Sequence, residues 1–194
     1  MRLHLNKPGI RALGIAESFS LKGRWSVLAG VVMRSDFVVD GVALGRTSVG
    51  GDYATAAIAS LHRRLRRNDV NLLMVSGAIL SLYNIIEVDE LAAKAQVPVV
   101  CLTYNESAGI EDSIRRHFDR PEGRLERYRR LGARSPVLLR TGLRVYVRNA
   151  GIGDPDARRV LDAFTLQGGV PEPVRIAKLL ARSARSLRSG ARRT

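Results

Sequence analysis

The side chains in this sequence that could take part in phosphodiester chemistry stand at the ends of apolar segments. Glu17 lies near the end of Arg11–Phe19, Asp52 follows a pair of glycines, and Ser76 follows Asn71–Val75. Hard cations such as Mg²⁺ need several oxygen ligands, and phosphodiester cleavage uses bound metal ions to polarise the phosphate and activate water. Carboxylates gathered from two such strand ends would supply those ligands.

The elements that must position these residues follow from the apolar periodicity, which predicts a mixed α/β domain. Three strands with short connections are expected first, which favours antiparallel neighbours: Arg11–Phe19, Trp25–Met33 and Phe37–Leu44. Helices and strands then alternate. Helices are expected at Tyr53–Arg67, Val88–Ala95, Ile110–Phe118 and Glu122–Leu131, and strands at Asn71–Val75 and Val97–Thr103. A hairpin at Val137–Arg140 and Leu143–Val147 follows, and the last two helices begin at Asp154 and Pro171. This order predicts a ribonuclease H-like α/β fold, a mixed sheet with helices on both faces.

The chain is expected to form a single domain over residues 1–187, followed by a basic, frayed tail at 188–194. No apolar run is long enough to span a membrane, and the first residues lack the pattern of a signal peptide. Cys101 is the only cysteine, which excludes an internal disulfide and fits a reducing compartment. A cytoplasmic protein with no membrane partner is expected.

In a nuclease of this layout, carboxylates from the first strand and from the end of the fourth strand meet to hold Mg²⁺. Here the first strand offers Ala16 and Glu17, and the fourth ends at Ser76. Because successive strand residues face opposite sides of a sheet, Ala16 and Glu17 cannot both point into one site. The sequence therefore predicts an incomplete metal cage.

Motifs spread along nearly the whole chain have the order and spacing of a known family. They are Arg11–Ile15, Asp40–Val42, Gly51–Thr55, Gly77–Ile79, Asn84–Asp89, Val97–Val100, Ala150–Ile152 and Pro171–Ala177. In these motifs the chain resembles an archaeal family of uncharacterised proteins related to endonuclease V, within the ribonuclease H-like superfamily. The resemblance implies that fold, descent from a metal-dependent endonuclease, and nucleic-acid association.

The chain departs from the pattern of that family at positions that matter for metal binding. Where family members carry a Gly-Ile-Asp-Asp motif, this sequence has Gly14-Ile15-Ala16-Glu17, and Ser76 stands in place of an aspartate before glycine. Lys178 replaces a histidine, and Gly50 replaces an acidic residue. The resemblance therefore carries over the fold and the nucleic acid, whereas nuclease activity is not carried over.

Three remaining carboxylates each have two interpretations. Asp52 and Asp89 match the family and are either surviving ligands or carboxylates that cap the starts of helices. Glu17 either replaces the missing aspartate with its longer side chain or points away from the site. Glu17, Asp52 and Ser76 are thus vestigial catalytic candidates. No metal or other cofactor is expected, and Mg²⁺ enters only if residual nuclease activity exists.

The charge is strongly positive, with 32 Lys and Arg against 18 Asp and Glu and a formal net charge of +14. Such a field attracts polyanions, which indicates DNA or RNA as a partner. The best candidate for the binding surface is one stripe of the last predicted helix. No acidic residue follows Glu172, which stands near the start of this helix. The stripe consists of Arg175, Lys178, Arg182, Arg185 and Arg188. The other interpretation of this stripe is a solvated helix face.

The sequence favours a basic nucleic-acid-binding domain with a degenerate metal site and without efficient nuclease activity, in effect a pseudoenzyme. One alternative is a residual Mg²⁺-dependent endonuclease that uses Glu17 and Asp52. Another is a protein-interaction subunit whose positive charge meets an acidic partner. The preference for RNA or DNA, the structure or lesion recognised, and association into a homo-oligomer stay open.

Overall fold

The structure is a computed structural model that describes residues 9–190, with side chains through residue 187. Its strands are β1 (Arg11–Ser18), β2 (Trp25–Arg34), β3 (Val39–Ser48), β4 (Leu72–Ser76), β5 (Ile79–Leu80), β6 (Asn84–Ile85), β7 (Val99–Thr103), β8 (Ser135–Leu138) and β9 (Arg144–Ala150). Its helices are α1 (Ala54–Arg64), α2 (Val88–Ala95), α3 (Glu111–His117), α4 (Glu122–Arg130), α5 (Asp154–Ala163) and α6 (Glu172–Gly190).

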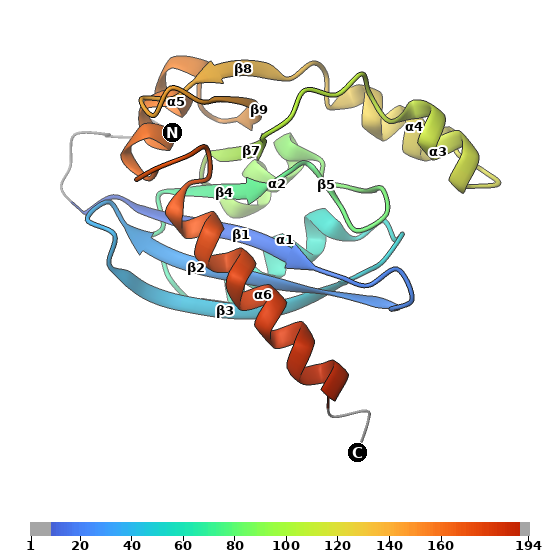
Figure 1. The fold of residues 1–194 in the computed structure, drawn as a ribbon, viewed down its shortest axis with the longest axis horizontal. Helices are drawn as coiled ribbons and strands as arrows, with labels where there is room; N and C mark the ends of the chain where they lie inside the picture. The colour runs from blue at the N-terminus through green and yellow to red at the C-terminus, as the bar shows by residue number, and fades with distance from the viewer. Residues whose placement is uncertain (1–8, 191–194) are drawn as a thin grey trace.

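Seven strands form one mixed sheet in the order β3-β2-β1-β4-β7-β9-β8, and β5 pairs with β6 in a small separate hairpin. The first three strands are antiparallel neighbours, as predicted, while β4 runs parallel to β1 and β7 runs parallel to β4. The strands β1, β4 and β7 therefore end at the same edge of the sheet. Beyond this edge α3 and α4 project from the sheet (Figure 1).

Helices cover both faces of the sheet, as the sequence predicts (Figure 1). We call one side the α1 face, where Leu13 and Ile15 pack with Ile58 and Leu61 of α1 in the larger core cluster. The other side is the α6 face, where α6 crosses β1 and β2. Gly14 permits this crossing, because a Cβ atom there would lie 2.2 Å from the carbonyl carbon of Pro173.

Strand β3 contains the bulge that Asp40-Gly41 predicts. Val32 of β2 pairs with Gly41 and Met33 pairs with Val39, so that Asp40 is the extra residue. The strand also continues to Ser48, beyond its predicted end at Leu44. Because β3 is an edge strand, it tolerates polar side chains. The apolar pattern of the sequence therefore does not reveal its last residues.

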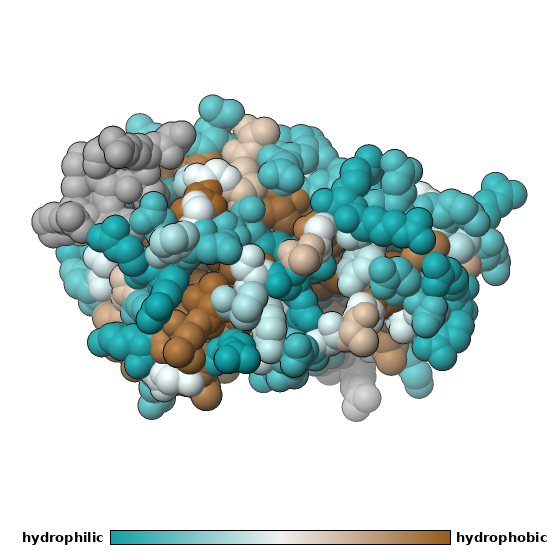
Figure 2. All heavy atoms as spheres, turned by 90° about the horizontal axis from the view of Figure 1, so that it is seen from above, coloured by the Kyte–Doolittle hydropathy of each residue, from teal (hydrophilic) through white to brown (hydrophobic). Residues whose placement is uncertain are grey.

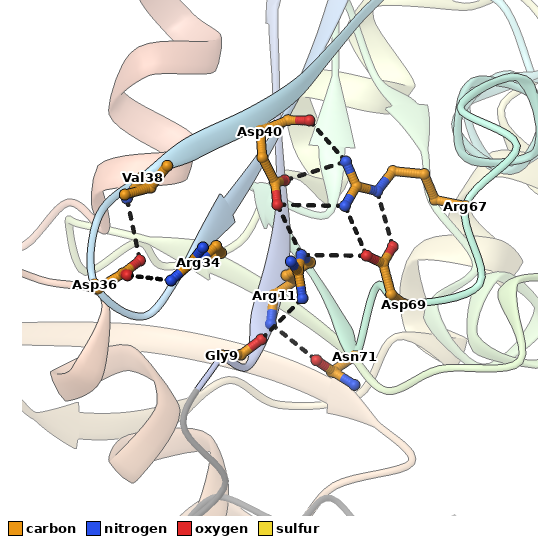
Figure 3. A network of polar contacts seen from close by, with 9 residues as sticks. All are labelled: Gly9, Arg11, Arg34, Asp36, Val38, Asp40, Arg67, Asp69 and Asn71. Atoms are coloured by element: carbon orange, nitrogen blue, oxygen red, sulfur yellow. Dashed lines mark hydrogen bonds and ion pairs between the residues drawn. The ribbon is translucent and has the colours of Figure 1, made fainter.

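Polar contacts of two arginines join the bulge at Asp40 to the start of β1 and to the segment between α1 and β4 (Figure 3). Arg11 of β1 donates from Nε to Oδ2 of Asp40 at 2.8 Å, and Arg67 donates from Nη1 to the Asp40 carbonyl at 2.7 Å. Arg67 also donates from Nε to Oδ1 of Asp69 at 2.8 Å. This network ties β1, β3 and the connection from α1 to β4 at the edge opposite the ends of β1 and β4.

Several helix boundaries differ from the sequence prediction. The N-cap of α1 is Tyr53 and makes no side-chain capping bond, so the interpretation of Asp52 as a cap is wrong. The N-cap of α5 is Gly153 rather than Asp154. Helix α6 runs to Gly190, three residues past the predicted end of the domain, and residues 191–194 of the predicted tail lie outside the described part of the chain.

The surface seen from above the β8 edge is mostly hydrophilic, with apolar areas between the hydrophilic side chains (Figure 2). Within residues 9–190, no helix is both long and apolar enough to cross a membrane. Cys101 is buried in β7, and this burial raises the pKa of its thiol to about 12. A buried thiol with this raised pKa stays protonated near neutral pH and is a poor nucleophile.

Candidate functional site

The end of β1 places two neighbouring residues on opposite faces of the sheet. Ala16 is 1% exposed and packs with Val31 of β2 and Ala177 of α6, on the α6 face. Glu17 lies on the α1 face, because strand residues alternate between the two sides. The position at which the resemblance implies an aspartate is therefore filled by a methyl group under a helix.

Both carboxylate oxygens of Glu17 accept hydrogen bonds. The Ser26 hydroxyl donates to Oε2 at 2.6 Å, and the backbone N–H of Ser81 donates to Oε1 at 2.5 Å. These bonds join β1 to β2 and to the turn between β5 and β6. A carboxylate held in this way by fixed donors stabilises the local fold.

The end of β4 brings hydroxyl groups to the α6 face. Leu72 and Met74 belong to the core cluster on that face, so alternation places Ser76 on the same side as Ala16. Tyr104, just after β7, packs against the same cluster. Burial raises the pKa of Tyr104 to about 12, while the nearby Ser76 hydroxyl acts in the opposite direction.

These residues do not fit a Mg²⁺ ion. The side-chain oxygens on the α6 face at this edge are the hydroxyls of Ser18, Ser76 and Tyr104, which are neutral, whereas Mg²⁺ is held through carboxylates and phosphates. Lys178, on α6, adds an exposed cation. Among residues 9–190, no group of three or more His, Cys, Asp or Glu residues is placed to hold a metal ion.

Asp52 forms ion pairs with two arginines of α4. Its Oδ1 atom lies 2.8 Å from Nη1 of Arg124 and 2.8 Å from Nη2 of Arg127. The family-matching aspartate thus connects the loop before α1 to a helix far along the chain. The pairing of Arg127 with Asp52 is a tertiary feature that the local sequence does not show.

Arg124 is the residue of this region that sequence reasoning missed. It is 9% exposed and donates to the carbonyls of Gly50, Gly51 and Tyr83 at 2.7 to 3.0 Å. Its guanidinium carbon lies 4.0 Å from the ring centroid of Phe118. Desolvation lowers the pKa of Arg124, and the neighbouring carboxylate partly offsets this shift. Nothing in the local sequence distinguishes Arg124 from the other arginines of α4.

Asp89 lies in the first turn of α2, with Glu90 beside it, where the helix dipole favours negative charge. It is exposed and lines a cavity of 540 Å³ between α2, α4 and β9. Because α2 packs on the α1 face, Asp89 lies on the opposite side of the sheet from Ala16. The structure does not bring Glu17, Asp52 and Asp89 together with Ser76 into one cage.

The basic stripe of α6 is only partly engaged by other residues. Arg175 pairs with Glu172 one turn earlier, and Arg185 donates from Nε to the Ser18 hydroxyl at 2.8 Å. Lys178 and Arg182 are exposed, and no ion pair among the described residues includes either of them. The Arg188 side chain lies outside the described residues. The stripe thus presents cations to solvent beside the end of β1.

A family model and a close relative place the chain among known proteins. The model of the endonuclease dU family matches residues 8–185. The chain belongs to this family. The chain is similar to the UPF0215 protein of Pyrobaculum calidifontis. The two are 38% identical over 174 residues, which cover 89% of this chain and 96% of that protein. The resemblance seen in the sequence motifs is confirmed.

Solved structures share the fold. A protein of unknown function from Archaeoglobus fulgidus has 25% identity and a TM-score of 0.78, covering 90% of this chain and 98% of that one. Endonuclease V of Ciona intestinalis, solved with a 24mer DNA containing an inosine, has 12% identity and a TM-score of 0.59, covering 92% and 86%. The ribonuclease H-like architecture predicted for this endonuclease dU family member is confirmed.

Proposed function

We propose that the protein binds nucleic acid through the basic stripe of α6 and lacks efficient nuclease activity. The observation that carries this proposal is the composition of the α6 face at the ends of β1 and β4. Ala16 packs under Ala177 there, and Ser76 offers only a hydroxyl. Phosphodiester cleavage by a metal-dependent route needs carboxylates at this edge, and none stands at these positions.

Nucleic-acid binding follows from the sign and placement of the charge. The net charge is +14, and no acidic residue follows Glu172 in the segment that forms α6. Exposed Lys178 and Arg182 can neutralise phosphates and release counterions without reading bases. The Ciona intestinalis endonuclease V, which shares the fold, was solved with DNA, and this supports the same class of partner.

A second candidate function is a residual Mg²⁺-dependent endonuclease that uses Glu17 and Asp52. The family description, endonuclease dU, favours it. The contacts of the two carboxylates weigh against it, because Glu17 is held by Ser26 and Ser81 and Asp52 is held by two arginines. A metal would have to displace these partners.

One experiment separates the two candidates. Nuclease-free protein is mixed with labelled single- and double-stranded DNA and RNA, with and without deoxyuridine and inosine, in Mg²⁺, Mn²⁺ or EDTA. We expect binding that persists in EDTA and weakens steeply with salt, and no cleavage in any metal.

Glu17→Gln and Asp52→Asn variants are the controls for the chemistry. Metal-dependent cleavage that both substitutions abolish would overturn the proposal and establish the second candidate. Failure to bind any of the nucleic acids at low salt would overturn nucleic-acid binding itself.

A further inference from the structure

Trp25, at the start of β2, is the only tryptophan of the chain and remains 37% exposed. Two guanidinium groups lie against its ring. The guanidinium carbon of Arg46 is 4.6 Å from the ring centroid, and that of Arg24 is 5.4 Å away. We call Arg24, Trp25 and Arg46 the Trp25 platform. The ring attracts both guanidinium groups electrostatically, so an indole surface and two positive charges are presented together.

The platform lies on the same face of the sheet as α6. Ser18 of β1 pairs with Val27 of β2, and Val27 pairs with Arg46 of β3, so these three side chains share one face. Alternation along β2 puts Trp25 on that face as well. Ser18 accepts a hydrogen bond from Arg185, which identifies the shared side as the α6 face.

A cavity of 680 Å³ links the platform to the last turns of α6. Arg46 lines it together with Ala184 and Leu187 of α6. Since Arg46 also contacts the Trp25 ring, the aromatic group and the basic stripe belong to one continuous surface. This surface lies at the end of β1, beside the edge where β1 and β4 terminate.

No carboxylate in the neighbouring chain segments opposes this positive surface. Residues 18–34, 41–51 and 173–194 contain no Asp or Glu. The Lys and Arg residues of these segments include Lys22, Arg24, Arg46, Lys178, Arg182 and Arg185. A groove or face with one sign of charge and an exposed aromatic ring is the arrangement that binds single-stranded nucleic acid.

We propose that the Trp25 platform stacks on an unpaired base of single-stranded nucleic acid, while Arg24, Arg46 and the stripe of α6 neutralise its phosphates. This inference rests on the proposed nucleic-acid binding and names the substrate class. In a duplex both faces of each base are already stacked, so the indole finds a partner only where bases are unpaired. Arg24 is exposed, and no ion pair among the described residues holds it over the ring.

The test uses the full chain and two readouts. Anisotropy of a labelled oligonucleotide measures affinity for a single strand and for its duplex. Fluorescence of Trp25, which is free of overlap from other tryptophans, reports whether a base reaches the ring. Trp25→Leu removes the aromatic face, Trp25→Phe keeps a smaller one, and Leu138→Ala, an exposed apolar residue of β8, is the matched control.

We expect the single strand to quench Trp25 fluorescence and the duplex to leave it unchanged. Trp25→Leu should weaken single-strand binding about tenfold and duplex binding less than about twofold, because stacking acts only on unpaired bases. Trp25→Phe should recover part of the loss, and Leu138→Ala should match the unmodified protein.

Two outcomes would overturn the inference in distinguishable ways. If single-strand binding left the fluorescence unchanged and survived Trp25→Leu, the Trp25 platform would have no role in binding. The proposal that α6 binds nucleic acid would still stand. Equal loss of single-strand and duplex affinity in Trp25→Leu would show that the residue shapes the surface rather than stacks on a base. Absence of binding to either form would overturn the proposed function.

Discussion

On the α1 face at the end of β1, Glu17 accepts hydrogen bonds from Ser26 and Ser81, and Asp52, in the loop before α1, is held by α4. On the α6 face of the same strand, Ala16 is buried under a helix whose exposed side carries Lys178. One side therefore holds carboxylates with fixed partners, and the other presents Lys178 and Arg182, which take part in no ion pair among the described residues.

This difference supports the proposal that this strand end binds anions rather than a metal ion. Buried or half-buried charges must be paired, so the surviving carboxylates are retained by the contacts that they make within the fold. Removal of a carboxylate from the α6 face leaves the positive charge of α6 unopposed there. The two faces can be tested separately, because their side chains do not share partners.

The largest effect is expected on the α1 face, from Arg124→Ala. This change leaves the carbonyls of Gly50, Gly51 and Tyr83 without their donor and removes one partner of Asp52. Loss of a nearly buried charged group from such a network should lower the free energy of unfolding by about 4 kcal/mol. Urea denaturation measures this change.

Arg158→Ala is the matched control for that substitution. Arg158 is an exposed arginine of α5, 3.7 Å from Asp162, and exposed pairs contribute less than about 1 kcal/mol. If Arg124→Ala and Arg158→Ala had equal effects on the unfolding midpoint, Arg124 would not anchor the loop before α1.

On the α6 face, Ala16→Asp should lower the free energy of unfolding by about 3 kcal/mol in EDTA, because the new carboxylate is buried without a partner.

The double variant Ala16→Asp/Ser76→Asp brings two carboxylates to one face. Mg²⁺ should raise its melting temperature in a concentration-dependent manner and leave that of the unmodified protein unchanged. Stabilisation of the unmodified protein by Mg²⁺ would contradict the poor fit described for its donors.

A smaller effect is expected when the exposed cations of the α6 face are removed. Lys178→Ala/Arg182→Ala should weaken nucleic-acid binding about tenfold at low salt and reduce the slope of affinity against salt by about two ions. The control variant Lys94→Ala/Arg158→Ala removes the same charge from helices α2 and α5. Equal losses in both double variants would indicate a nonspecific response to net charge.

The smallest effect concerns the network at the opposite edge. The hydrogen bond from Arg67 lowers the pKa of Asp69, so the pair stabilises the fold above the unfolded pKa of about 4 and loses this effect as the pH falls through the folded pKa. Asp69→Asn should cost less than about 1 kcal/mol near pH 7, because Asp69 is 40% exposed. Urea midpoints of the two proteins should converge in acid, and a difference that grows in acid would contradict this sign.

Much of the fold could be predicted from local patterns. The helix Val88–Ala95 has its predicted bounds, and the bulge at Asp40 follows from an Asp-Gly pair inside an apolar strand. The hairpin of β5 and β6 was not predicted, because each strand contains only two residues and shows no periodicity. The separation of Ala16 and Glu17 followed from strand alternation alone.

The sequence by itself determined the order of the helices and of the seven strands of the main sheet, the positive charge, and the absence of aspartates at positions 16 and 76. It could do so because periodicity and composition are properties of contiguous residues. Only the tertiary structure decided that Asp52 pairs with Arg124 and that Trp25 shares a surface with α6. Those contacts join residues far apart in the chain, and their geometry depends on how the helices cross the sheet.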